Sequence, residues 1–161
     1  MKKIILSLCF IALCLPAYAA GTITDGLYLG YVNGQIEILE QHQALKRNGL
    51  AFEYYENGDV KKLFNYHNNQ LDGFAIQYYE NKNPCYLLHF KNGVLNGLGE
   101  YYYSNGQLAA ELFYKNGQPD GIVRFYSEGG ILEKAVQYEN GKVIRTKVSA
   151  PSVLVESQKA S

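Results

Sequence analysis

The sequence offers few side chains that could hold a metal ion. Its three histidines are His42, His67 and His89, and no two of them have the spacing of a metal-binding pair on a helix. None of them lies within a few residues of a second strong ligand set such as Cys-x-x-Cys. We therefore expect no metal ion and no other cofactor.

Nucleophiles and paired carboxylates are equally sparse. Cys85 has no neighbouring residue that would activate a thiol. Glu53, Glu100 and Glu111 are scattered, so no acid–base pair is indicated. The glycines form no Gly-x-Gly-x-x-Gly phosphate-binding loop. These observations predict that the protein is not an enzyme and has no catalytic residues.

The dominant pattern is an internal repeat with an exact period. A glycine recurs at equal spacing four times, a tyrosine follows each glycine by five residues, and another aromatic residue follows it by seventeen. The glycines are Gly49, Gly73, Gly97 and Gly121, the tyrosines are Tyr54, Tyr78, Tyr102 and Tyr126, and the later aromatic residues are Tyr66, Phe90, Tyr114 and Tyr138. One 24-residue unit has thus been copied.

Alignment of the units accounts for the isolated chemical groups. His67 stands where another unit has Lys91, which indicates a solvated turn residue. Cys85 stands where other units have Lys61 and Ala109, which indicates an exposed or half-exposed strand position.

Each unit contains two turn signals, and the spacing between successive signals alternates between eleven and thirteen. Asn-Gly between apolar runs is a strong hairpin signal, because tight hairpin turns require positive φ at their central residues. The segments between the turns are short and rich in aromatic and β-branched residues, which favours strands. The turns are Asn57-Gly58 and Asn68-Asn69, Asn81-Lys82 and Asn92-Gly93, Asn105-Gly106 and Asn116-Gly117, and Gly129-Gly130 and Asn140-Gly141.

Alternation along the second strand of each unit predicts one apolar sheet face along the whole array. This face is the predicted core, and the fold class is all-β, built from about five units of successive antiparallel β-hairpins. The residues on it are Val60, Phe64, Tyr66, Leu88, Phe90, Leu108, Leu112, Tyr114, Leu132, Val136 and Tyr138.

The first nineteen residues have the three-part pattern of a secretory signal peptide: two lysines, an apolar run over 4–15, and the small-residue site Ala17-Tyr18-Ala19. We expect cleavage after Ala19 and release into the periplasm or the medium without a transmembrane segment. Removal of this segment leaves a net charge near −2, which gives no electrostatic case for nucleic acid. It also leaves a single cysteine, so we expect no internal disulfide.

The same patterns suggest boundaries within the exported chain. Residues 20–48 form a degenerate capping repeat, in which the segment from Glu37 to Arg47 could be strand or a short helix. Four full repeats follow, at 49–72, 73–96, 97–120 and 121–144. Residues 145–161 lose the pattern, and we expect a largely disordered tail.

The clearest copy is Tyr102-Tyr103-Ser104-Asn105-Gly106-Gln107-Leu108, followed by Phe113-Tyr114-Lys115-Asn116-Gly117-Gln118-Pro119-Asp120-Gly121. This pattern resembles the MORN repeat variant (membrane occupation and recognition nexus) over about residues 26–144. The resemblance implies an elongated, twisted antiparallel sheet, and bacterial members are often labelled as antitoxin components. Three positions depart from it: Lys82 replaces a turn glycine, Pro84 lies early in a strand, and Gly129 replaces a turn asparagine.

Adjacent tyrosines in each unit must point to opposite faces of the sheet. The stripe formed by Tyr55, Tyr79 and Tyr103 is the candidate binding surface, although tyrosine also suits the half-buried positions of a thin sheet.

Three functions remain open at this point. The first is a protein–protein interaction scaffold, the second an antitoxin or immunity protein that meets its toxin outside the cytoplasm, and the third a module that binds membrane or envelope polymers. The near-neutral charge gives no polybasic patch for anionic lipid. The identity of the partner and the oligomeric state do not follow from the sequence.

Overall fold

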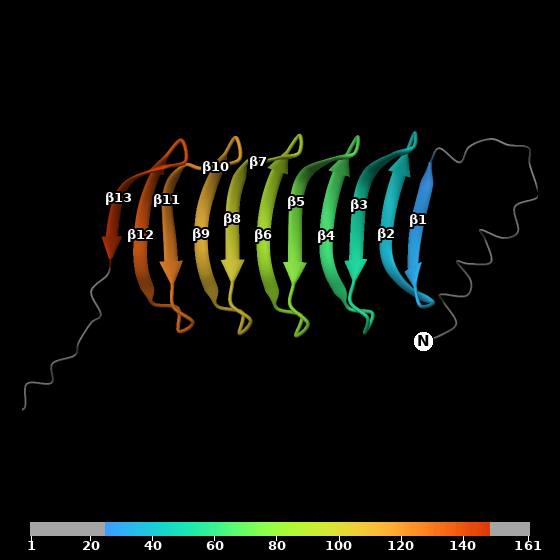
Figure 1. Ribbon diagram of the computed structural model, residues 1–161, viewed down its shortest axis with the longest axis horizontal. Helices are drawn as coiled ribbons and strands as arrows, with labels where there is room; N and C mark the ends of the chain where they lie inside the picture. The colour runs from blue at the N-terminus through green and yellow to red at the C-terminus, as the bar shows by residue number, and fades with distance from the viewer. Residues whose placement is uncertain (1–24, 149–161) are drawn as a thin grey trace, which may run out of the picture.

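The structure, a computed structural model, describes residues 25–148, and within this range it contains strands and turns but no helix. Thirteen strands form one antiparallel sheet (Figure 1). The predicted all-β fold of successive hairpins is therefore confirmed. The strands are β1 (Gly26–Val32), β2 (Gln35–Gln43), β3 (Lys46–Tyr54), β4 (Val60–His67), β5 (Gln70–Tyr78), β6 (Pro84–Lys91), β7 (Val94–Leu95), β8 (Gly97–Tyr102), β9 (Leu108–Lys115), β10 (Gln118–Pro119), β11 (Gly121–Tyr126), β12 (Leu132–Glu139) and β13 (Lys142–Val148).

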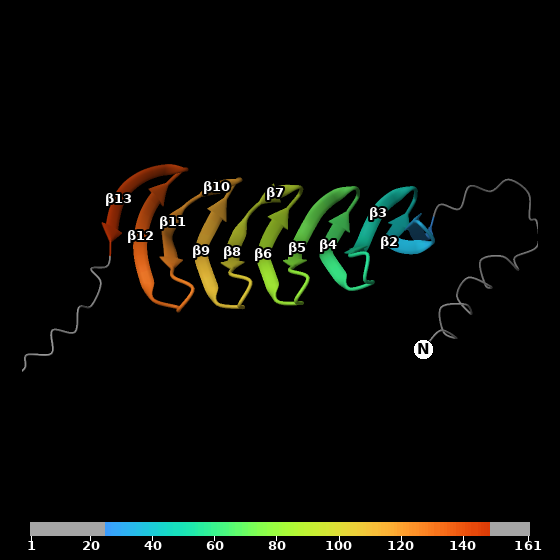
Figure 2. The same cartoon turned by 60° about the horizontal axis from the view of Figure 1, so that its bottom comes forward.

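The strands lie side by side in chain order, from β1 at one end to β13 at the other. The two-residue strands β7 and β10 lie off this path and pair with β6 and β9. Figure 2 shows that the strands are bowed and that, within the described residues, no second layer covers the sheet. Each hairpin therefore contacts only the hairpins beside it, as expected for a repeat array.

The turns at the two ends of the strands differ. At one end both central residues have positive φ, for example Asn68 at 50° and Asn69 at 69°, as the hairpin argument required. At the other end, both residues of the first turn, Asn33 and Gly34, also have positive φ, but in the four full repeats only the second residue does, for example Gly58 at 84°. There the Tyr55 amide donates to the Asp59 carbonyl at 2.8 Å, which closes a longer turn. The expectation of two positive φ angles at Asn57-Gly58 is therefore wrong, because this loop has more residues over which to reverse direction.

The core lies on the sheet face predicted from the second strands, which we call the core face. It is built from a cross-strand pair that recurs once in every repeat, with a small side chain on the first strand opposite a larger one on the second in the first three copies. The pairs are Ala51 with Phe64, Ala75 with Leu88, Gly99 with Leu112, and Val123 with Val136. Ala51, Ala75, Leu112, Val123 and Val136 are the buried apolar residues of the described chain, each at most 8 % exposed.

Close packing explains why the third pair has a glycine at position 99. A Cβ atom on Gly99 would lie 2.8 Å from the Tyr114 ring and 3.1 Å from Leu88, so the sheet cannot accept a larger side chain there without moving those neighbours.

The opposite side of the sheet, which we call the outer face, changes character along the array. Across the first six strands a row of directly paired positions is apolar, and across the next three it is charged. The apolar row is Leu29, Leu39, Phe52, Leu63, Ile76 and Leu87, and it continues into Glu100, Glu111 and Arg124.

The ends of the array differ from the sequence-based boundaries. The segment from Glu37 to Arg47 is strand, turn and strand, with the turn at Ala44 and Leu45 (φ 49° and 63°), so the alternative of a short helix is wrong. At the other end, residues 145–148 pair with β12 as part of β13, whereas we had expected a tail there. The array pattern weakened because β13 has no following repeat to pack against. The signal segment and residues 149–161 lie outside the described residues.

Candidate interaction surface

Aromatic side chains line the core face on both sides of its buried row. All eight are half-buried, so each presents part of its ring to solvent. Together they make the core face a continuous apolar and aromatic surface, the kind of surface that dominates protein–protein contacts. They are Phe64, Tyr66, Tyr86, Phe90, Tyr101, Tyr114, Phe125 and Tyr138.

The middle of this surface is held together by tyrosine contacts. The rings of Tyr86 and Tyr101 pack with centroids 6.4 Å apart, and the hydroxyls of Tyr101 and Tyr114 are hydrogen-bonded at 2.9 Å. Burial raises the pKa of Tyr101 well above its usual value, and the hydrogen bond to Tyr114 raises it further. Burial also raises the pKa of Tyr86. These hydroxyls therefore remain neutral, and the surface offers rings and hydroxyl groups rather than charge.

Charged side chains flank the aromatic centre. The Lys62 ammonium lies 2.8 Å from Glu53, and this hydrogen bond is the main cause of the raised pKa of Lys62. Near the other end, Lys134 lies over the Phe125 ring, 4.5 Å from its centroid. The core face thus carries cationic side chains near both ends of its aromatic centre.

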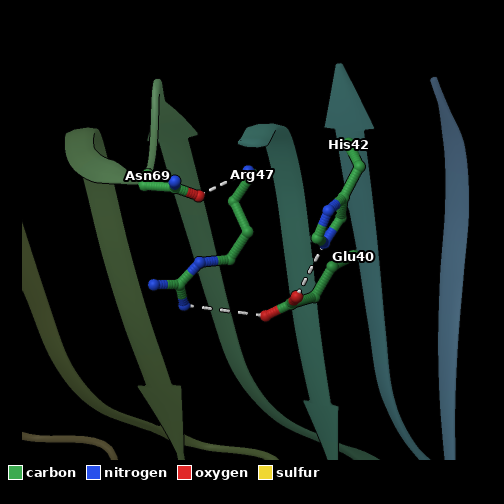
Figure 3. Close-up of polar contacts among 4 residues, drawn as sticks. All are labelled: Glu40, His42, Arg47 and Asn69. Carbon is green, nitrogen blue, oxygen red and sulfur yellow. Dashed lines mark hydrogen bonds and ion pairs between the residues drawn. The ribbon is translucent and has the colours of Figure 1, made fainter. Parts of the chain in front are cut away.

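The N-terminal end of the core face carries a polar network (Figure 3). Glu40 accepts from the His42 ring at 3.0 Å, and the Arg47 guanidinium lies 3.7 Å from the second Glu40 oxygen. The Arg47 amide donates to the Asn69 side chain at 2.7 Å. Arg47 also stacks 4.2 Å from the Tyr66 centroid, which joins the network to the aromatic surface.

Sequence reasoning did not single out this network. Glu40 and His42 stand one full repeat before Phe64 and Tyr66, so extending the alignment by one unit would have placed two polar residues on the core face of the first hairpin.

The three tyrosines predicted as a binding surface make hydrogen bonds between successive repeats, and their binding role stays a prediction. Each follows the last residue of a strand, is half-buried, and donates its hydroxyl to the backbone carbonyl of the tyrosine 23 residues later. We call this set the tyrosine latch. Its bonds are Tyr55 to Tyr78 at 2.7 Å, Tyr79 to Tyr102 at 2.8 Å and Tyr103 to Tyr126 at 2.8 Å. The hydroxyls thus link one repeat to the next.

A second set of hydrogen bonds, made by the backbone alone, joins the repeats at the opposite ends of the strands. In every full repeat, the amide of a turn residue donates to the carbonyl of a residue 22 positions earlier in the chain, at the start of the strand after the preceding turn on this side. The bonds are Asn69 to Arg47 at 3.0 Å, Gly93 to Leu71 at 2.7 Å, Gly117 to Leu95 at 2.8 Å and Gly141 to Pro119 at 3.0 Å.

The two remaining histidines and the cysteine do not come together in one site. His67 is exposed at the end of β4, with its ring 3.2 Å from the Asn48 side chain, and the His89 ring lies 3.0 Å from the Leu98 carbonyl. Cys85 is half-buried in β6, and its hydrogen bond with the Tyr79 hydroxyl raises the pKa of Tyr79. Over residues 25–148 no three His, Cys, Asp or Glu side chains come together as a possible metal site. The same stretch contains no helix of the length and hydropathy needed to cross a membrane.

Comparison with known protein families places four tandem matches to the MORN repeat variant on this chain, at residues 47–68, 71–92, 95–116 and 119–140. A comparison with curated proteins gave no significant match. The matched segments cover more than half of the sequence and coincide with the hairpins that carry the core pairs and the latches. The chain belongs to the MORN repeat variant family.

Proposed function

We propose that the protein is an exported, non-catalytic scaffold whose core face binds an extended segment of a partner protein. MORN repeats generally serve as modules that bind proteins or membranes, and the repeat itself is a non-enzymatic unit. The observation that carries the proposal is the continuous aromatic surface of the core face.

The geometry favours an extended protein segment over a compact ligand. The half-buried rings are spread over β4 to β12, so a small molecule would meet only a fraction of them. A chain lying across the strands would cover several rings and reach the charged groups near both ends, such as Lys62 and Lys134. Burying aromatic rings that are already held in place costs little side-chain entropy, which favours binding.

Export rests on the sequence. The apolar run over residues 4–15 and the Ala17-Tyr18-Ala19 site match a cleaved secretory signal. The mass of the protein recovered from the periplasm or the medium tests this part, with Ala20 as the expected first residue.

Site-specific photo-crosslinking tests the binding surface. Gln77 lies on the core face opposite Tyr86, and Gln137 lies on the outer face opposite Ile122. A photoreactive phenylalanine analogue at position 77 should crosslink one defined protein in intact cells, whereas the same group at position 137 should not. Crosslinks from position 137 alone, or equal crosslinks from both positions, would rule out the core face as the binding surface.

A further inference from the structure

Among residues 25–148 no strand pairs with the outer edge of β1 or of β13, and these two edge strands differ in sequence. β13 carries three cationic side chains, Lys142, Arg145 and Lys147, and all its residues are exposed. β1 carries no charged residue and no proline. Charged side chains on an edge strand are a common protection against pairing with another chain. By this criterion the β13 edge is protected and the β1 edge is open.

Both edge strands expose apolar side chains, with Val143, Ile144 and Val148 of β13 at 55–69 %, so the difference between the edges lies in the charges among them. Leu27, Tyr28, Tyr31 and Val32 are 50–55 % exposed, so large apolar side chains project on both sides of the strand. An uncharged edge with such side chains is a typical template for strand pairing.

We propose that β1 pairs antiparallel with β1 of a second copy of this chain, with the two-fold axis at Leu29. This register places Leu29 opposite Leu29 of the second copy and Leu27 opposite Tyr31 of the second copy. These side chains share the outer face because residues two apart on a strand point the same way. Cross-strand apolar pairs of this kind stabilise a sheet.

The same register is favourable on the core face. Tyr28 falls opposite Gly30 of the second copy, an arrangement in which an aromatic ring covers a strand glycine. Gly26 falls opposite Val32 of the second copy. No charged residue meets another anywhere along the seven-residue strand, because β1 contains none.

The outer face supplies a second argument. Its apolar row runs from Leu87 to Leu29 and stops at the open edge. Pairing through β1 joins this row to the equivalent row of the second copy and shields the apolar side chains of both edge strands from water.

Other edge pairings fit less well. Pairing β13 with β13 would bring two sets of three cations together. Pairing β1 with β13 by translation along the array would be parallel, because the two strands run in the same direction (Figure 1). That contact is also head-to-tail, so it would build open filaments rather than a closed dimer.

Light scattering and sedimentation on the exported chain test the proposal, which does not depend on the proposed partner. The unmodified protein should be a dimer. Leu29→Lys and Leu29→Glu should each raise the dimer Kd by about 100-fold or more, since each removes two buried leucines and sets like charges opposite one another. Mixing the two variants should restore a heterodimer. Val143→Lys, at a position 58 % exposed on β13, is the matched control and should remain dimeric.

A second measurement decides the matter if a charge at position 29 unfolds the end hairpin. Leu29→Cys in a Cys85→Ser background should give a covalent dimer with a short bis-maleimide reagent, and Val143→Cys in the same background should not. A monomeric unmodified protein, a ladder of higher oligomers, or crosslinking through position 143 instead of position 29 would overturn the proposal.

Discussion

The interior repeats and the two end units obey different rules. In the interior, Phe64 and its equivalents fill the core face, and Tyr55, Tyr79 and Tyr103 each bond to the following repeat. In the first unit a carboxylate, Glu40, stands in the place of Phe64. In the last unit Ser127 stands in the place of the latch tyrosine, and its hydroxyl accepts from the amide of Ile131 within its own turn.

This contrast shows which residues make contacts with the next repeat and which make contacts within their own hairpin. A latch tyrosine needs the carbonyl of a following repeat, and the last unit has none, so a short side chain that closes its own turn is sufficient. A core residue needs apolar neighbours on both sides, and the first unit has only one full repeat beside it. Beside β1, the core face of the first unit instead carries the polar side chains Glu40 and His42.

A similar contrast occurs where a strand glycine with positive φ lies beneath the side chain of the preceding hairpin. Asn65 covers Gly73 and donates to the Asp72 carbonyl at 2.8 Å. At the last such glycine, Gly121, the corresponding residue is Phe113, and no atom lies within 4 Å of the position where a Cβ would be. Phe113 is 51 % exposed instead. The hydrogen-bonded cover is thus lost toward the C-terminal end.

The largest expected effect comes from deletions, which distinguish a repeat array from a closed domain. Removing residues 97–120 joins Asn96 to Gly121, so Tyr79 can reach the Tyr126 carbonyl as it now reaches Tyr102. We expect a cooperative melt at a lower temperature with unchanged β-type circular dichroism. Removing only residues 109–120 should abolish the cooperative melt, because strands would then meet the wrong partners. Equal loss of folding in both variants would contradict the array.

Removal of the latch should weaken the interior without touching the ends. Tyr79→Phe should lower the free energy of unfolding by about 1 kcal/mol, because it leaves the Tyr102 carbonyl without its donor. The triple change of Tyr55, Tyr79 and Tyr103 to Phe should cost about three times as much, since the latches lie in separate repeats. Urea titration measures both. Tyr138→Phe, which removes no hydrogen bond that the structure shows, is the control and should change stability little.

Lys82 tests the turn geometry of one interior repeat against the others. It has φ of 71° where the other full repeats have Gly58, Gly106 and Gly130. Lys82→Gly should be more stable than Lys82→Ala by about 1 kcal/mol, because both lose the ion pair to Asp59 but only glycine relieves the backbone. Gly106→Ala should lower the free energy of unfolding by a similar amount, because it places a side chain in the same conformation. Equal stability of the two Lys82 variants would mean that the turn relaxes to accept a side chain.

The smallest expected effect concerns alkaline pH. Burial raises the pKa of Tyr101 above its usual value of 10.0, so the folded state keeps a proton that the unfolded state releases. The contribution of Tyr101 to the free energy of unfolding should therefore be fully present below pH 10 and should be lost as the pH rises above it. Tyr101→Phe should flatten this decline in denaturation experiments between pH 9 and 11. An unchanged slope would indicate that other tyrosines, such as Tyr86, control the alkaline transition.

The sequence by itself determined the repeat. The 24-residue period, the turn positions and the apolar parity of β4, β6, β9 and β12 all follow from local rules of strand alternation and turn conformation, which act over a few residues. The end of the array was harder to place, because residues 145–148 pair with β12 without the apolar pattern of an interior strand.

Only the tertiary structure decided what the side chains at the repeat junctions do. A hydrogen bond from Tyr79 to a carbonyl 23 residues away depends on how two hairpins lie against each other, and a period in the sequence does not specify that distance. The sequence therefore marked Tyr55, Tyr79 and Tyr103 as candidates for binding, whereas packing commits their hydroxyls to the array. Likewise, Glu40 and Arg47 form a network beside Tyr66 only because β2 pairs with β3 and β3 pairs with β4.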